Sequence, residues 1–83
     1  MDIKVLGPGC ANCRRLYEET EKAVKQLAMT ATITKVEKFE EMAPYRIMMT
    51  PALVINGEVK AAGRIPRVAE ITTWLANAAM EER

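Results

Sequence analysis

The 83-residue chain contains no histidine, and it has only one tryptophan, one phenylalanine and two tyrosines. The absence of histidine removes the side chain that proteins use most often as a general base and as a metal ligand. Charge of either sign is also not in excess, because 12 lysine and arginine residues stand against 11 aspartate and glutamate residues. A domain that binds nucleic acid is expected to carry a basic surface. We therefore expect no nucleic-acid partner.

Long apolar runs are absent as well. No stretch of about 18 apolar residues occurs, so no membrane-spanning helix is expected. Residues 1–4 lack the basic head and apolar core of a signal peptide, which predicts a cytoplasmic protein. The length predicts a single domain over residues 1–83 with a small core, and we expect a monomer. In a reducing cytoplasm a pair of cysteines is more often catalytic or metal-binding than a structural disulfide.

Both cysteines, Cys10 and Cys13, lie in the stretch GPGCANC at residues 7–13. A short apolar strand is predicted before this stretch, over residues 2–6. From residue 11 to about residue 28, apolar residues recur with the spacing of one helix face. The predicted helix therefore begins at the cysteine pair.

This position has a chemical consequence for the first cysteine. The thiolate is the nucleophile in disulfide exchange, and the unpaired backbone N–H groups at a helix start stabilise this anion and lower its pKa. Cys13 turns back beneath the helix end and is expected to be the more buried of the two. The pattern predicts that Cys10 attacks a substrate disulfide and that Cys13 then resolves the mixed disulfide. A disulfide closing so short a loop stabilises a fold only slightly, which favours reversible exchange over a structural role.

The middle of the chain predicts one more strand and one short helix. Residues 31–37 are rich in β-branched side chains and predict a strand. This strand should be parallel to the first one, because a helix connects them. Residues 40–46 predict a short helix with Pro44 in its first turn, where the missing N–H does no harm. Three methionines in and after this segment are expected to fill gaps in the core; they are Met42, Met48 and Met49. The alternative is that they form an apolar rim for a protein partner or assist in binding a soft metal.

The last third of the chain predicts a hairpin and a helix. Residues 52–55 and 58–62 should form two antiparallel strands, because the Asn-Gly pair at 56–57 suits a type I′ turn, which needs positive φ at both central positions. Pro66 suits the first position of the final helix. Residues 80–83 are expected to fray.

The element order βαβαββα predicts an α/β fold with a four-stranded mixed sheet flanked by three helices. Together with VLGPGCANC at residues 5–13, TPALVING at 50–57 and AGRIP at 62–66, this order resembles the thioredoxin fold. More narrowly, the chain resembles the small, glutaredoxin-sized thioredoxin-like proteins that are often called redox-active disulfide proteins. The resemblance covers nearly the whole chain, and the three motifs agree in order and spacing.

The resemblance implies roles for two further residues. In proteins of this fold, the proline that matches Pro51 forms a cis peptide bond beside the two cysteines. The backbone of the preceding residue, here Thr50, pairs with an extended substrate chain. The implied partners are disulfide-containing protein substrates and an upstream electron donor similar to thioredoxin reductase, with no resident cofactor or metal.

The chain also departs from the family pattern. Larger thioredoxins usually carry Trp-Cys-Gly-Pro-Cys and a buried aspartate six residues before the first cysteine. Here Gly9 replaces the tryptophan and Lys4 stands in the position of the aspartate. No carboxylate is therefore expected there to take the proton from Cys13. Residues 62–65 lack the second glycine and the aspartate of a glutaredoxin glutathione site, so no glutathione site is expected.

Two alternatives to a redox function are left open by the residues alone. A thiolate pair can hold Cu(I), or Zn(II) with ligands from outside the chain, so a soft-metal carrier is the first alternative. The missing histidine, the missing Met-x-Cys-x-x-Cys motif and an element order other than βαββαβ argue against it. The second alternative is an interaction module that keeps the fold without redox turnover. The leading prediction is a thiol–disulfide oxidoreductase that acts as a small electron carrier.

Overall fold

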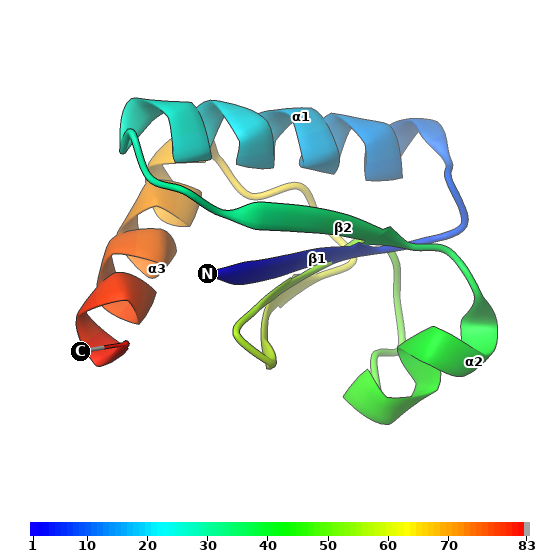
Figure 1. The fold of residues 1–83 in the computed structure, drawn as a ribbon. Helices are drawn as coiled ribbons and strands as arrows, with labels where there is room; N and C mark the ends of the chain where they lie inside the picture. Colours follow the sequence, from blue (N-terminus) through cyan, green and yellow to red (C-terminus); the bar gives the residue numbers. More distant parts are fainter. Residues whose placement is uncertain (83) are drawn as a thin grey trace.

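The computed structural model describes residues 1–82, and its centre is a four-stranded sheet with the order β2-β1-β3-β4 (Figure 1). Strand β1 (Asp2–Leu6) lies inside the sheet and is parallel to β2 (Thr32–Val36). On its other side β1 pairs antiparallel with β3 (Ala52–Ile55), which in turn pairs antiparallel with β4 (Glu58–Ala62). The predicted mixed sheet and the parallel pairing of the first two strands are confirmed.

Helices cover both faces of this sheet (Figure 1). Helix α1 (Ala11–Gln26) and helix α3 (Val68–Glu81) pack on one face, over the larger apolar cluster. The short helix α2 (Phe39–Met42) lies on the opposite face, over a smaller cluster. With three helices in the predicted order, the α/β fold class is confirmed.

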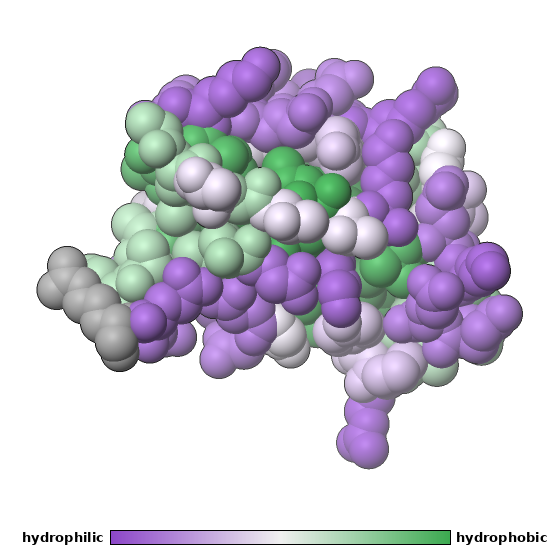
Figure 2. Space-filling view, in the orientation of Figure 1, coloured by the Kyte–Doolittle hydropathy of each residue, from purple (hydrophilic) through white to green (hydrophobic). Residues whose placement is uncertain are grey.

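The alternation of side chains along β1 explains why two clusters exist. Ile3 and Val5 point to the face of α1 and α3, whereas Leu6 belongs to the cluster beneath α2. Successive residues of a strand point to opposite faces, so both faces of this inner strand are buried. Figure 2 shows hydrophilic side chains along the outer side of α1, with hydrophobic ones gathered between α1 and the sheet. Within residues 1–82, no helix has the length and apolar character needed to cross a membrane.

The hairpin between β3 and β4 positions the residues that precede it. Asn56 has a φ of 48° and Gly57 a φ of 84°, so the predicted turn with two positive φ values is confirmed. At the other end of the hairpin, the Gly63 N–H donates a hydrogen bond of 2.8 Å to the Pro51 carbonyl. The segment that leads into β3 is therefore tied to the segment that leaves β4.

Helix α1 ends at Gln26, two residues before the predicted end. Ala28 adopts a φ of 51°, and its N–H donates to the Lys25 carbonyl over 3.1 Å. The Met29 N–H donates to the Val24 carbonyl over 3.3 Å. These two bonds form a Schellman motif, in which the residue after the C-cap takes the left-handed conformation and satisfies carbonyls that the helix leaves free.

The prediction of one short helix over residues 40–46 is wrong in its detail. The α-helix covers Phe39–Met42 and is followed by a 3₁₀ turn, η1 (Ala43–Tyr45). A proline inside an α-helix lacks the N–H for its hydrogen bond and clashes with the carbonyl four residues earlier. Pro44 would lie beyond the first turn of a helix that begins at Phe39. The chain changes to a new turn instead, in which the proline stands at the start.

The boundaries of the last helix also differ from the prediction. Pro66 is buried but lies outside the helix, which begins at Val68 with Arg67 as its N-cap. The Arg67 backbone N–H donates to the Glu70 carboxylate over 3.3 Å, and this contact fixes the helix start after the proline.

The end of this helix is held in place by contacts that local sequence does not reveal. The helix continues to Glu81, although the sequence predicts fraying from residue 80. Glu82 lies 3.5 Å from the amino group of Met1 and accepts a hydrogen bond of 2.9 Å from the Asn56 amide. The last residue of the predicted frayed segment, residue 83, lies outside the described residues.

Candidate active site

Cys10 is the N-cap of helix α1 and is exposed. Its backbone is extended, with φ −69° and ψ 170°, and its carbonyl accepts the first helical hydrogen bond, from the Arg14 N–H, at 3.0 Å. Its side chain takes the place that serine or aspartate takes in most caps, because the sulfur accepts a hydrogen bond of 3.3 Å from the Cys13 N–H. A helix start thus directs a backbone donor at an accessible sulfur.

Cys13 lies one turn further along the same helix and is buried, with 5% of its surface exposed. Its sulfur is 2.7 Å from the Cys10 sulfur, and both side chains are free thiols. A small rotation of the side chains would bring the sulfurs to the bonding distance of a disulfide, about 2.05 Å. The pair therefore combines an accessible thiol with a protected one that can reach it.

The two thiols differ in pKa as well as in exposure. The hydrogen bond from the Cys13 thiol lowers the pKa of Cys10, and the hydrogen bond from the Cys13 backbone N–H lowers it further. Burial raises the pKa of Cys13, and so does the hydrogen bond that its thiol makes with Cys10. Each group contributes to the shift of the other, because a proton held by Cys13 stabilises a negative charge on Cys10. The arrangement thus favours ionisation of the exposed sulfur first.

The residues predicted to hold substrate lie at the same end of the sheet as the cysteines. The Thr50–Pro51 peptide bond is cis; Pro51 is buried and Thr50 is exposed. Gly7, at the end of β1, separates this segment from the helix. A Cβ atom on Gly7 would collide with the Cys13 sulfur and would lie 3.7 Å from the Cβ of Thr50. The four predicted site residues are therefore brought together around a buried glycine.

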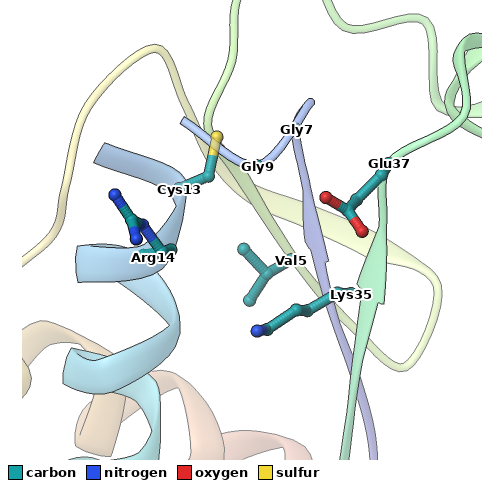
Figure 3. Close-up of a pocket in the computed structure, with 7 residues that line it drawn as sticks. All are labelled: Val5, Gly7, Gly9, Cys13, Arg14, Lys35 and Glu37. Carbon is teal, nitrogen blue, oxygen red and sulfur yellow. The ribbon is translucent and has the colours of Figure 1, made fainter. Parts of the chain in front are cut away.

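A small cavity of about 120 Å³, called here the inner cavity, opens beside Cys13. It is lined by side chains and backbone of Val5, Gly7, Gly9, Cys13, Arg14, Lys35 and Glu37. Figure 3 shows Cys13 on α1 and Glu37 just after β2 on opposite sides, with Gly7 and Gly9 between them. Sequence reasoning missed Glu37, because only the pairing of β2 with β1 brings it to the cysteine end of the sheet.

A larger hollow of about 520 Å³, called here the apolar groove, adjoins Thr50 on the side of α2. Its walls include Phe39, Met48 and Met49, which are 80%, 94% and 62% exposed. The prediction that the methionines fill the core is right for Met42, which is 8% exposed, and wrong for the other two. The two exposed methionines lie outside any helix or strand, so no periodic pattern could have placed them.

Lys4, at the position of the family's aspartate, has a different environment from the cysteine pair. Its ammonium group donates a hydrogen bond of 3.0 Å to the Tyr45 hydroxyl. This bond raises the pKa of Lys4, and the tyrosine belongs to the cluster beneath α2. The Lys4 side chain therefore lies on the face of the sheet that α2 covers, and the inner cavity lies on the other face.

The site offers few further ligands for a metal ion. Within residues 1–82, no group of three or more cysteine, aspartate or glutamate side chains is arranged to hold one. Soft metals accept two thiolates, but zinc usually has four ligands. A zinc ion on this pair would need ligands from outside the chain.

A mixed sheet between helices, with a Cys-x-x-Cys pair at the start of α1, is the arrangement of a small thiol–disulfide exchange domain. A family model described as a thioredoxin domain matches residues 1–76. A thioredoxin of Methanothermobacter thermautotrophicus is 34% identical over 71 residues, which cover 86% of this chain and 92% of that protein. A thioredoxin of Methanocaldococcus jannaschii is 36% identical over 69 residues, which cover 83% of this chain and 79% of that protein. The chain belongs to the thioredoxin family, and its cysteine spacing fits a thiol–disulfide oxidoreductase.

Proposed function

We propose that this protein is a cytoplasmic electron carrier that reduces disulfides in other proteins, with Cys10 as the attacking and Cys13 as the resolving cysteine. The observation that carries the proposal is the pairing of an exposed N-cap sulfur with a buried sulfur 2.7 Å away. The lowered pKa of Cys10 and the raised pKa of Cys13 support the same division of roles. Only the thiolate is nucleophilic, so the sulfur that ionises first attacks first.

The reaction runs in two exchanges. The Cys10 thiolate attacks one sulfur of the substrate disulfide, and the other substrate sulfur leaves as a thiolate that takes up a proton. The Cys13 thiolate then attacks the Cys10 sulfur, a Cys10–Cys13 disulfide forms, and the second substrate sulfur leaves. The substrate has gained two electrons and the protein has lost two. A dithiol donor, such as a reductase of the thioredoxin reductase type, would return the pair to its reduced form.

The substrate would lie across Thr50 and the apolar groove. Thr50 is exposed next to the buried Pro51, so its backbone can pair with an extended segment that carries the target disulfide. The groove begins at Thr50 and offers the exposed side chains of Met48 and Met49 to an apolar residue of that segment. Burial of such a side chain contributes about 1.5–3 kcal/mol before the entropic cost of binding.

The reduction of insulin disulfides, with dithiothreitol as the electron source, tests this function. Cys10→Ser should lower the protein-dependent rate to the background of dithiothreitol alone, because the remaining thiol, Cys13, is buried. Cys13→Ser should stop turnover as well but should accumulate a covalent complex with insulin through Cys10. Ala11→Ser places a hydroxyl at an exposed neighbouring position and is the matched control, expected to keep the wild-type rate. Full activity in both cysteine variants would sink the proposal.

The docking surface has its own test. Met49→Gln should raise the KM for insulin several-fold and leave the rate with Ellman's reagent unchanged, because the small disulfide does not need the groove. An unchanged KM for insulin would show that the substrate lies elsewhere.

A further inference from the structure

Cys13 must lose a proton before it can resolve the mixed disulfide, and its surroundings oppose this loss. Cys13 is buried, with 5% of its surface exposed, and burial raises the pKa of its thiol. Lys4, the strand residue at the position of the family's aspartate, binds Tyr45 on the opposite face of the sheet. The proton therefore needs another acceptor near Cys13.

The inner cavity contains one suitable group. Among the described residues that line it, Glu37 alone carries a carboxylate. The other charged residues that line the cavity are both cations: Arg14 from α1, and Lys35 from β2, two residues before Glu37. The Lys35 ammonium lies 4.8 Å from the centre of the Tyr17 ring, a partly buried side chain of α1. Glu37 also borders the apolar groove, where the other described lining residues carry no charge.

The backbone around Glu37 keeps the path to Cys13 open. A Cβ atom on Gly9 would collide with the Glu37 Oε2 atom, and a Cβ atom on Gly7 would collide with the Cys13 sulfur. Two positions without side chains therefore separate the carboxylate from the thiol (Figure 3). The space of about 120 Å³ has room for water, since one molecule needs roughly 10–15 Å³ of such space. Glu37 is an exposed residue, and among residues 1–82 it takes part in no ion pair.

We propose that Glu37 is the proton acceptor for Cys13, acting through water in the inner cavity during resolution of the mixed disulfide. The Cys13 S–H proton passes to water and from water to the Glu37 carboxylate, while the Cys13 sulfur bonds to the Cys10 sulfur. The bond between Cys10 and the substrate breaks, and its electron pair leaves on the substrate sulfur. The carboxylic acid of Glu37 then returns the proton to that thiolate or to solvent. This inference rests on the proposed function and adds a residue to it.

One equivalent of Ellman's reagent separates the two steps in time. Attack by Cys10 releases the first thionitrobenzoate, and resolution by Cys13 releases the second. Glu37→Gln keeps the size of the side chain but cannot accept the proton, so the second phase at neutral pH should slow at least about tenfold relative to the first. Glu37→Asp keeps a carboxylate and should recover most of the rate. Glu40→Gln removes the same charge from an exposed position outside the cavity and should behave as the wild type.

The pH profile distinguishes proton transfer from a structural effect. In the wild type the second phase should become independent of pH near neutrality, because the proton moves within the protein. In Glu37→Gln the second phase should rise about tenfold per pH unit until Cys13 itself ionises. Equal second-phase rates and equal profiles in the two proteins would overturn the role of Glu37 and leave the proposed function intact. Release of only one thionitrobenzoate by the wild type would overturn both.

Discussion

The free backbone groups at the two ends of helix α1 find hydrogen-bond partners in different ways. Each end of a helix leaves backbone groups without a helical partner. At the C-terminal end, the Ala28 and Met29 N–H groups donate to carbonyls of the last turn, so backbone groups satisfy backbone groups. At the N-terminal end, the Cys10 sulfur accepts the Cys13 N–H. The backbone therefore caps the C-terminal end of the helix, whereas an accessible and reactive sulfur caps the N-terminal end.

This difference places the reactive groups of the protein at the N-terminal end of α1. A sulfur that caps a helix stabilises the fold weakly, but the same hydrogen bond favours its ionised form. In the wall of the inner cavity, Gly7 leaves space beside the Cys13 sulfur and Gly9 leaves space beside the Glu37 carboxylate. The C-terminal end of α1 carries no cysteine, so it can be improved for stability alone. Changes at the two ends should therefore have opposite kinds of effect.

The largest effect on stability and on thiol exchange is expected for Gly7→Ala, beside the N-terminal end of α1. The added methyl group would collide with the Cys13 sulfur, so the helix start must shift. Insertion of a methyl group into a packed site should lower the free energy of unfolding by about 1–3 kcal/mol. The second phase with Ellman's reagent should slow as well, because Cys13 is displaced. Urea unfolding and stopped-flow absorbance measure the two effects.

Gly57→Ala is the matched control for this change. A Cβ at Gly57 meets no atom within 4 Å, although the residue has a φ of 84°. It should cost about 1 kcal/mol of stability through its left-handed backbone and leave both exchange phases unchanged. If the two alanine variants exchange thiols equally fast, the site does not depend on the space at Gly7.

A smaller effect on stability, of the opposite sign, is expected for Ala28→Gly at the C-terminal end of α1. Alanine with a φ of 51° is strained, and glycine adopts this conformation freely. The change should raise the free energy of unfolding by about 1 kcal/mol, measured in urea, without altering the thiol reactions. Ala76→Gly, inside α3, should lower stability by a similar amount, because glycine is unfavourable within a helix. Equal losses in the two variants would contradict the account of the helix end.

The smallest effect is a pH dependence of the stability of the reduced protein. Folding lowers the pKa of Cys10, so stability should rise with pH from the folded pKa of Cys10 up to the ordinary cysteine value. Folding raises the pKa of Cys13, so stability should fall as the pH rises further toward the folded pKa of Cys13. A shallow maximum near pH 8.5, roughly the ordinary value, is expected in urea unfolding at a series of pH values.

The cysteine variants separate the two limbs of this curve. Cys10→Ser should remove the rising limb, and Cys13→Ser should remove the falling one. A stability that does not change with pH over roughly pH 7–10 would show that the thiols are not shifted in opposite directions.

Local signals in the sequence were enough for most of the fold. The strands at residues 2–6, 52–55 and 58–62 have the predicted bounds, because each is limited by glycine, proline or the Asn-Gly turn. The start of α1 at the cysteine pair is also confirmed. The predictions failed where two local rules competed, as at Pro44, where the helix divides into an α-helix and a 3₁₀ turn.

The site could be predicted only in part. Cys10 and Cys13 are found by their spacing, and Thr50 and Pro51 by resemblance to the family. Glu37 is charged and follows a strand, which is typical of many surface residues, and only its strand's pairing with β1 brings it to the inner cavity. The exposure of Met48 and Met49 likewise depends on how the segment before β3 packs over residues distant in the sequence.

The division of roles between the two sulfurs of α1 can be tested by a direct titration of each thiol. In reduced protein labelled with ¹³C at the cysteine Cβ atoms, the chemical shift of each cysteine can be followed against pH. Cys10 should ionise below the ordinary pKa of cysteine, and Cys13 should ionise above it. If Cys13 ionised first, or if both ionised together at the ordinary value, the assignment of attacking and resolving cysteine would be contradicted.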